Sequence, residues 1–248
     1  MSFHRYRTMK RTLAQPLHAR PGSHQEQHLN TLAVVICGIV GAHHVPFAQI
    51  ADHAPIRAAK TARLITRLRR WVTHKAGTPE AVWRPFARAV RAGLAHAPLT
   101  LVWDGTTAGR GCMGVLASVV YHGCAIPLRW SVVKGKKGHL PQDEPCALIT
   151  RLQTVIPDSA AVVLLGDGEC AGTQLHAAIR TAGWEDGGRT GTNSTISAQD
   201  RAFPVGDLPL KRGAAVALEN VQMTAERYGS VLLLGIWETN QDTPIGVI

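Results

Sequence analysis

The sequence has few cysteines, and they form no pattern that indicates a disulfide framework or a zinc site. Its 248 residues contain five cysteines, an odd number, and no two of them form a C-x-x-C motif. Disulfide-held secreted domains and zinc fingers use even or closely spaced sets of cysteines. The cysteines therefore argue against both classes and favour a reducing compartment.

Long apolar segments are also missing. The most apolar run, residues 32–40, is too short to span a bilayer, which takes about 20 apolar residues. The first thirty residues are rich in His, Arg and Gln, and they contain no apolar stretch typical of a signal peptide. We therefore expect a soluble intracellular protein without a membrane partner.

Acidic residues are scarce in the first hundred positions. Residues 1–100 hold 15 Lys and Arg against three Asp and Glu, a net charge of +12, whereas the remaining residues carry −2. Phosphate contacts dominate the affinity of proteins for nucleic acid, and a clustered basic charge is their usual signature. The asymmetry predicts a polyanion-binding module that precedes a second domain.

The basic part predicts a flexible tail over residues 1–27 and a helical DNA-binding domain over residues 28–97. Apolar spacing indicates helices over 29–39, 46–52, 56–75 and 79–97. On the third of these helices, basic side chains recur every three or four residues and form one stripe: Arg57, Lys60, Arg63, Arg67 and Arg70. The stripe suits contact with DNA phosphates, and the alternative is a solvated charged face.

After Pro98 the pattern changes to strands. An apolar run over 99–103 ends at Asp104 and is followed by a glycine-rich turn. The sequence then predicts a hairpin of strands over 113–121 and 124–133, a helix over 143–155, a buried strand over 160–165 and a helix over 172–183. Beyond residue 189 we expect a β-rich segment, with strands over 189–196, 214–222 and 228–237.

Two aspartates stand out, because an apolar strand precedes each of them. Asp104 follows L-T-L-V-W, and Asp167 follows V-V-L-L-G. If the two strands are parallel neighbours, both acids meet at one edge of the sheet, where ligand sites of α/β proteins lie. Paired carboxylates are hard ligands for Mg²⁺ or Mn²⁺, which catalyse phosphoryl transfer. Taken singly, an Asp after a strand is more often a helix cap or a turn residue.

The order of strand, hairpin, helix and strand, with acids on the first and last strands, resembles the ribonuclease H-like fold. The stretch from Asp104 to Trp184 includes D-G-T-T-A-G-R-G, Y-H-G-C-A-I-P-L-R-W and L-L-G-D-G-E-C-A-G. It resembles bacterial DDE transposases of the insertion-sequence-four family. The resemblance implies an α/β protein with a ribonuclease H-like core over 98–189, after the helical domain, and a β-rich insertion over 190–248.

The resemblance also implies roles for individual residues. Asp104 and Asp167 match the family's first two catalytic aspartates, which bind two divalent metal ions. Thr106 and Thr107 match the small hydroxyl pair after the first acid, and Arg189 falls where the family has an arginine near the DNA end. The implied partners are double-stranded DNA, as transposon ends and target DNA, and a second copy of the chain when it is active on DNA. The implied location is the bacterial cytoplasm, in association with the nucleoid.

Two departures from the family pattern leave two hypotheses open. Gly168 stands where the family commonly has an arginine, and the family's third acid, a glutamate on a later helix, has no match before Ile248. We therefore expect either a truncated transposase that cleaves and transfers DNA strands, with or without activity on its own, or a non-catalytic protein that binds DNA ends as a relic or competitor.

Overall fold

The structure is a computed structural model that describes residues 3–17, 23–55, 61–74, 79–94, 98–135, 143–167, 172–198, 201–224 and 227–248. The chain divides into two compact units, Met1–Gly93 and Leu94–Ile248. This division falls close to the boundary predicted at residue 97. The predicted boundary after residue 189, by contrast, lies inside the second unit.

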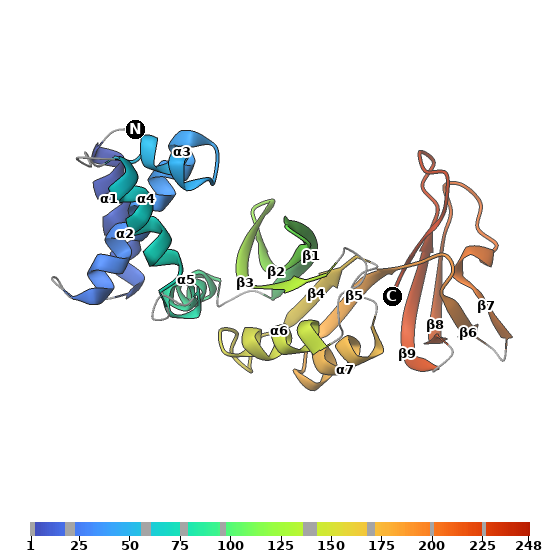
Figure 1. Ribbon diagram of the computed structural model, residues 1–248. Helices are drawn as coiled ribbons and strands as arrows, with labels where there is room; N and C mark the ends of the chain where they lie inside the picture. The colour runs from blue at the N-terminus through green and yellow to red at the C-terminus, as the bar shows by residue number, and fades with distance from the viewer. Residues whose placement is uncertain are drawn as a thin grey trace. The chain divides into compact units, whose positions relative to one another are not determined.

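The first unit is helical. Its helices are α1 (Phe3–Leu17), α2 (His24–Ala42), α3 (Phe47–Asp52), α4 (Thr61–Val72) and α5 (Pro79–Gly93) (Figure 1). None of the helices in the described part of the chain combines the length and the apolar character needed to cross a membrane.

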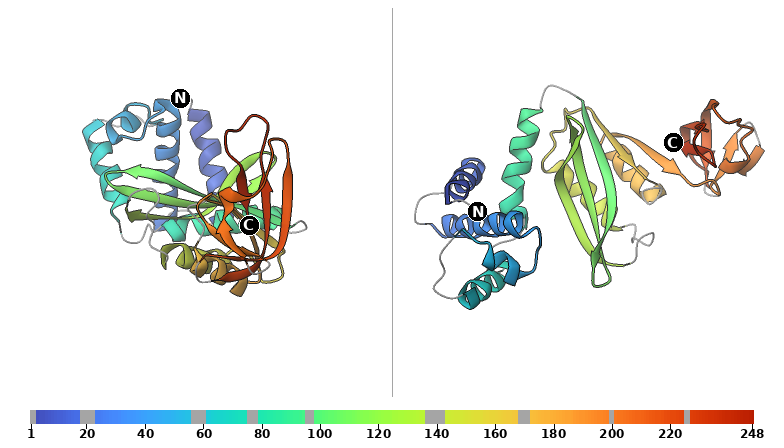
Figure 2. Two further views of the ribbon diagram at one scale, coloured as in Figure 1. Left: turned by 90° about the vertical axis from the view of Figure 1, so that its right-hand side faces the viewer. Right: turned by 90° about the horizontal axis from the view of Figure 1, so that it is seen from above.

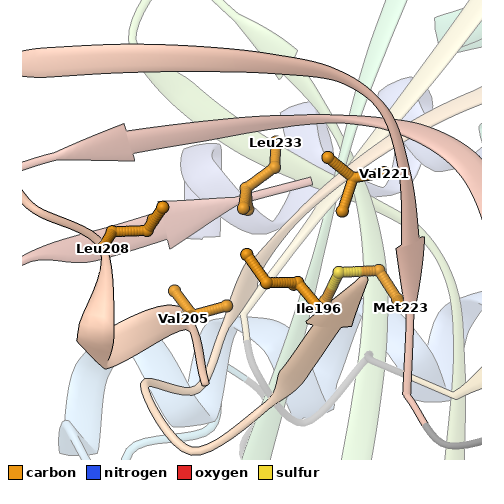
Figure 3. Packing of buried hydrophobic residues seen from close by; sticks show 6 residues of the cluster. All are labelled: Ile196, Val205, Leu208, Val221, Met223 and Leu233. Atoms are coloured by element: carbon orange, nitrogen blue, oxygen red, sulfur yellow. The ribbon is translucent and has the colours of Figure 1, made fainter. Parts of the chain in front are cut away.

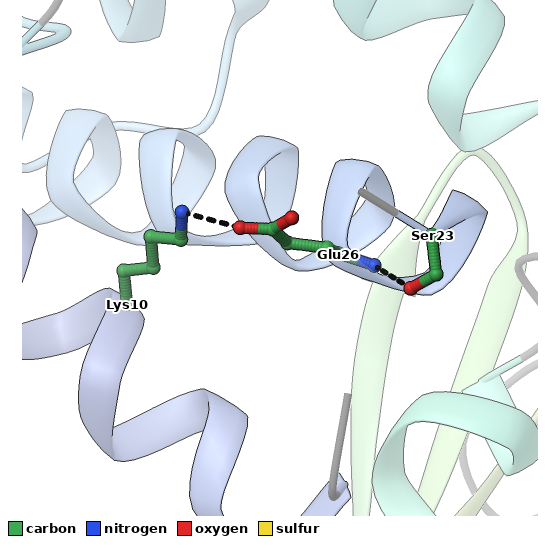
Figure 4. Close-up of polar contacts among 3 residues, drawn as sticks. All are labelled: Lys10, Ser23 and Glu26. Atoms are coloured by element: carbon green, nitrogen blue, oxygen red, sulfur yellow. Dashed lines mark hydrogen bonds and ion pairs between the residues drawn. The ribbon is translucent and has the colours of Figure 1, made fainter. Parts of the chain in front are cut away.

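Helix α2 begins at a side-chain cap and is tied to α1 by an ion pair (Figure 4). The Ser23 hydroxyl accepts a hydrogen bond from the Glu26 backbone N–H at 3.2 Å, which satisfies one donor of the first turn. The Glu26 carboxylate also lies 2.8 Å from the Lys10 ammonium on α1. Glu26 therefore supports both the start of α2 and its contact with α1.

The prediction of a flexible tail over residues 1–27 was wrong for residues 3–17, which form α1, and for residues 24–27, which begin α2. Leu13 of this helix is 8% exposed and packs with Leu29 of α2, and Tyr6 and Met9 are partly buried beside it. These three residues recur every three or four positions, the spacing of one helix face. The many polar residues between them hid the pattern in the sequence.

The second unit is a mixed sheet with two α-helices among its described residues. Its elements are β1 (Leu99–Gly109), β2 (Cys112–Tyr121), β3 (Cys124–Lys134), α6 (Asp143–Gln153), β4 (Val162–Gly166), α7 (Thr173–Thr181), β5 (Glu185–Thr190), β6 (Thr195–Ala198), β7 (Arg201–Pro204), β8 (Ala215–Met223), β9 (Tyr228–Ile236) and β10 (Ile245–Val247). The strand order is β3-β2-β1-β4-β5-β10-β9-β8-β6-β7. Strands β1 to β3 form an antiparallel meander, and β4 and β5 run parallel to β1. This arrangement is consistent with the ribonuclease H-like fold expected from the sequence.

Strand β1 is longer than predicted. The glycine-rich stretch after Asp104 stays paired with β2 as far as Gly109, so the chain turns at Arg110 and Gly111 instead. Both turn residues have positive φ, 51° and 68°. Asp104 therefore lies inside β1, although it directly follows the last residue of β1 that pairs with β4.

The strand predicted over 189–196 was wrong in its limits. Residues 185–190 form β5 beside β4, and a turn separates β5 from β6 at Thr195. Strand β5 has the sequence E-D-G-G-R-T, which carries no apolar side chain. Its pairing with β4 on one side and β10 on the other makes it a strand, which the local sequence does not indicate.

The β-rich segment has its own apolar cluster (Figure 3). Side chains from β6, β8, β9 and the turn after β7 meet there: Ile196, Val205, Leu208, Val221, Met223 and Leu233. Ile196, Val221 and Leu233 are fully buried. The cluster explains why this segment folds although its sequence pattern is weak.

Candidate functional site

The sheet formed by β1 to β5 has two different faces. Ser131 of β3 donates a hydrogen bond to Glu144 of α6 at 2.9 Å, and Asp186 of β5 contacts His176 of α7. Both helices therefore lie on the same face, and Figures 1 and 2 show them on one side of these strands. Side chains alternate along a strand, so the residues next to Ser131 and Asp186 on their strands point to the opposite face of the sheet. We call this the open face.

Asp104 and Asp167 both belong to the open face. Trp103 of β1 and Gly166 of β4 are in register, so the two aspartates are the next residues on parallel neighbouring strands. Trp103 is buried toward the helices, whereas Asp104 and Asp167 are exposed. Neighbouring strands lie about 4.8 Å apart, so this register places the two residues side by side.

Arg189 lies next to this pair. Gly166 is also in register with Gly188 of β5, which places Arg189 beside Asp167 on the following parallel strand. The Arg189 side chain is exposed, and alternation along β5 places it on the face opposite Asp186. The structure thus brings together three predicted site residues that are separated by up to 85 positions in the sequence.

The predicted hydroxyl pair extends the site along β1. Thr106 lies two residues after Asp104, so it shares the open face, and it is exposed. Thr107 is exposed as well, but as the residue after Thr106 on β1 it belongs to the opposite face of the sheet. Gly168, which replaces the arginine common in the resembling family, lies outside the described residues.

The two aspartates could hold a divalent metal ion, because carboxylate oxygens are the ligands that Mg²⁺ and Mn²⁺ prefer. Both side chains are exposed, which leaves room for water and phosphate oxygens as further ligands. Within the described ranges, no group of three His, Cys, Asp or Glu side chains is positioned to bind a metal. A third protein ligand is therefore not provided by the described residues.

The predicted basic stripe lies partly on α4, in the first unit. Arg63, Arg67 and Arg70 are exposed on this helix, while Leu64 and Leu68 on its other face are 4% and 0% exposed. Arg57 and Lys60 fall outside the described residues. Helix α4 is amphipathic as expected, and its arginines face solvent rather than the apolar core.

A cluster around His176 was not predicted. His176 contacts Asp186, and its ring stacks on Tyr228 with the ring centroids 5.4 Å apart. The Arg180 guanidinium lies 5.4 Å from the centroid of the Tyr228 ring and donates to the Ser230 carbonyl at 3.2 Å. These contacts connect α7 and β5 to β9, which is distant in sequence, so no local pattern could have revealed them.

The same cluster borders a cavity of about 440 Å³ between α7, β5 and β9. Burial raises the pKa of the Tyr228 hydroxyl above its usual value; the nearby Arg180 opposes this shift and Asp186 adds to it. The hydroxyl is buried and has no hydrogen-bond partner among the described residues. The cluster lies on the helix-covered face, opposite the aspartate pair, and it fixes β9 to the sheet.

Comparison with known proteins gives structural similarity at low sequence identity. No protein-family model and no curated protein matches the chain. A piggyBac transposase synaptic complex with hairpin DNA is similar, with a TM-score of 0.48 and 9% identity; the similarity covers 98% of this chain and 57% of that one. Endonuclease V from Ciona intestinalis, in complex with DNA, has a TM-score of 0.33 and 14% identity over 66% of this chain and 80% of its own. Human endonuclease V has a TM-score of 0.34 and 11% identity over 68% and 82%.

Proposed function

We propose that this protein cleaves and transfers DNA strands in a metal-dependent reaction of the type that DDE transposases catalyse. The observation that carries the proposal is the alignment of Asp104, Asp167 and Arg189 across three neighbouring parallel strands. The resemblance of residues 104–184 to insertion-sequence-four transposases suggests the reaction. The strongly basic first hundred residues suggest how double-stranded DNA is held.

Asp104 and Asp167 would hold Mg²⁺ or Mn²⁺ at this position. Two carboxylates about one strand spacing apart repel each other, and a cation between them removes that cost. When bound, such ions stabilise the charge that develops on the attacked phosphate and on the leaving oxygen. The positive charge of Arg189, next to the pair, suits binding of a non-bridging phosphate oxygen.

The proposed reaction has two steps at phosphorus. In the first, a water oxygen bonds to the phosphorus in line with the 3′ oxygen and the bond to that oxygen breaks; the attacking water releases a proton to solvent, and the leaving 3′ oxygen takes one up to become a hydroxyl. In the second, the free 3′-hydroxyl attacks a phosphodiester of the target DNA in the same way. Neither step needs a covalent bond to the protein, so the role of the side chains is to position and to neutralise charge.

The test is nicking of supercoiled plasmid by the full chain with Mg²⁺ or Mn²⁺. We expect Asp104→Asn and Asp167→Asn each to lower the nicking rate by at least about 100-fold, because removing a metal ligand costs several kcal/mol of transition-state stabilisation. Asp158→Asn is the matched control, since Asp158 is an exposed acid before β4 and outside the open face. Unchanged nicking in both site variants would refute the catalytic proposal.

A second candidate function is DNA-end binding without catalysis. It is favoured by one observation, the lack of a third metal-ligating side chain beside Asp104 and Asp167 among the residues that the structure describes. Under this alternative, the wild-type chain binds DNA in a salt-dependent manner but does not nick plasmid with either metal. Nicking that depends on Asp104 and Asp167 would exclude it.

A further inference from the structure

The first unit contains an open pocket of about 700 Å³ between α2 and α4. Its main lining side chains are cationic, imidazole or indole groups: His24, His28, Arg67, Arg70, Trp71 and His74. The remaining lining residues are uncharged and polar, and no Asp or Glu is among the described residues that line it. The cavity is therefore a site of positive potential with hydrogen-bond donors around it.

Three residues that line this cavity each have a buried polar atom without a partner. The Nδ1 of His28, the Oδ1 of Asn30 and the Nε1 of Trp71 make no hydrogen bond to any described residue. A buried polar atom that lacks a partner destabilises the fold, so such atoms usually meet a ligand or water. Three of them in one cavity point to a polar ligand.

The charges select an anion over a cation. Arg67 donates a hydrogen bond to the Thr31 hydroxyl at 2.8 Å, which fixes its guanidinium at the wall, and Arg70 lies one helical turn further along α4. The imidazoles of His28 and His74 lie with their ring centroids 5.3 Å apart. Among the described residues, His24, His28 and His74 do not form a metal-binding group. The positive charges of Arg67 and Arg70 would also repel a metal ion.

We propose that this cavity binds a phosphate group of the DNA backbone, held by Arg67 and Arg70 from α4 and by His28 and His74. This inference rests on the proposed DNA-processing function and adds to it a specific phosphate site. The arginines supply permanent charge and forked donors, which match phosphate oxygens. The indole N–H of Trp71 is a further donor at the same wall.

The histidines add a pH dependence to this binding. Burial lowers the pKa of His28, and the nearby His74 and His24 lower it further. The other charged groups that line the same cavity are Arg67 and Arg70 on α4. A bound phosphodiester monoanion favours the protonated imidazole, so binding takes up a proton at His28 and becomes tighter as the pH falls toward the lowered pKa of this group.

The first test measures the affinity of the full chain for a duplex oligonucleotide by fluorescence anisotropy at several salt concentrations. We expect Arg70→Gln to weaken binding roughly tenfold and to lower the slope of log affinity against log salt by about 1. Arg69→Gln is the control, because Arg69 is the exposed neighbour on α4 that does not line the cavity. Equal effects of the two substitutions would contradict a specific phosphate site.

The second test uses inorganic phosphate and the imidazole signals of the full chain in NMR spectra. We expect phosphate to shift the ring signals of His28 and His74, and Arg70→Gln to abolish these shifts. His28→Gln should remove the extra gain in DNA affinity that the wild type shows as the pH falls below the ordinary histidine range, because the pKa of His28 is lowered. Ring signals that stay unchanged up to saturating phosphate would overturn the inference.

The two proposals fail in different ways. If the full chain binds no DNA at low salt, the proposed function itself is wrong. If DNA binding is strong and salt-dependent but is the same in wild type, Arg70→Gln and His28→Gln, the proposed function stands and the phosphate site is wrong.

Discussion

The thiol groups of the chain have very different surroundings. Cys37 of α2 is 2% exposed, and burial raises the pKa of its thiol, whereas Cys124 at the start of β3 is exposed. The thiolate is the reactive form, so a raised pKa and burial both slow alkylation. We expect iodoacetamide at pH 8 to modify Cys124 in the native protein and to leave Cys37 unmodified until the protein unfolds.

Mass spectrometry of peptides at successive times checks this prediction. Cys124→Ser should abolish the early modification at that position and leave the protection of Cys37 unchanged. Alkylation of Cys37 at the rate of Cys124 under native conditions would contradict the packing of α2 described above.

At the candidate site, residues next to clear strands could be predicted and residues brought in by tertiary contacts could not. Asp104 and Asp167 each follow an apolar run, and this local signal pointed to both. Arg189 was placed from the family resemblance alone, because its own strand has no apolar pattern. His176 and Asp186 meet only because α7 packs on β5, and neither has a local signal of its role.

Among the elements, those with strong periodicity were predictable and those formed by pairing were not. The helical predictions over 29–39 and 79–97 correspond to α2 and α5, and the predicted hairpin corresponds to β2 and β3. Strand β5 depends on its neighbours, and α1 buries few apolar residues among many polar ones. In both missed elements, the stabilising contacts come from residues distant in sequence.

The turn between β2 and β3 gives a prediction at the element scale. Tyr121 pairs with Cys124, and the two residues between them, His122 and Gly123, have φ of 46° and 76°. Two positive φ values define a type I′ turn, for which Asn-Gly is the preferred sequence. We expect Gly123→Ala to destabilise the protein by about 1 kcal/mol and His122→Asn to be neutral or stabilising.

Urea unfolding followed by circular dichroism measures this difference. The T-shaped contact between the rings of Tyr121 and His122, with centroids 4.4 Å apart, is lost in His122→Asn and can offset part of the gain. A loss of stability larger in His122→Asn than in Gly123→Ala would contradict the turn type.

At the scale of the whole molecule, each compact unit has its own apolar core. Leu68 of α4 and Leu233 of β9 are both 0% exposed, the first in the helical unit and the second in the β-rich cluster. Replacing a buried Leu with Ala costs about 2–5 kcal/mol. We expect calorimetry to resolve two transitions, with Leu68→Ala lowering one and Leu233→Ala lowering the other. A single transition that both substitutions lower equally would show that the two cores unfold together.

The two aspartates of the pair differ in how the sheet holds their backbones, because Asp104 lies inside β1. Asp104 is held by a strand that continues for five residues beyond it and is paired there with Leu116 of β2. Asp167, by contrast, follows the last residue of the short strand β4. If the pair binds a metal ion as proposed, little further ordering of the backbone is needed at Asp104, because β2 already holds it. Affinity for the metal should therefore respond more to changes that stiffen the end of β4 than to changes that stiffen β1.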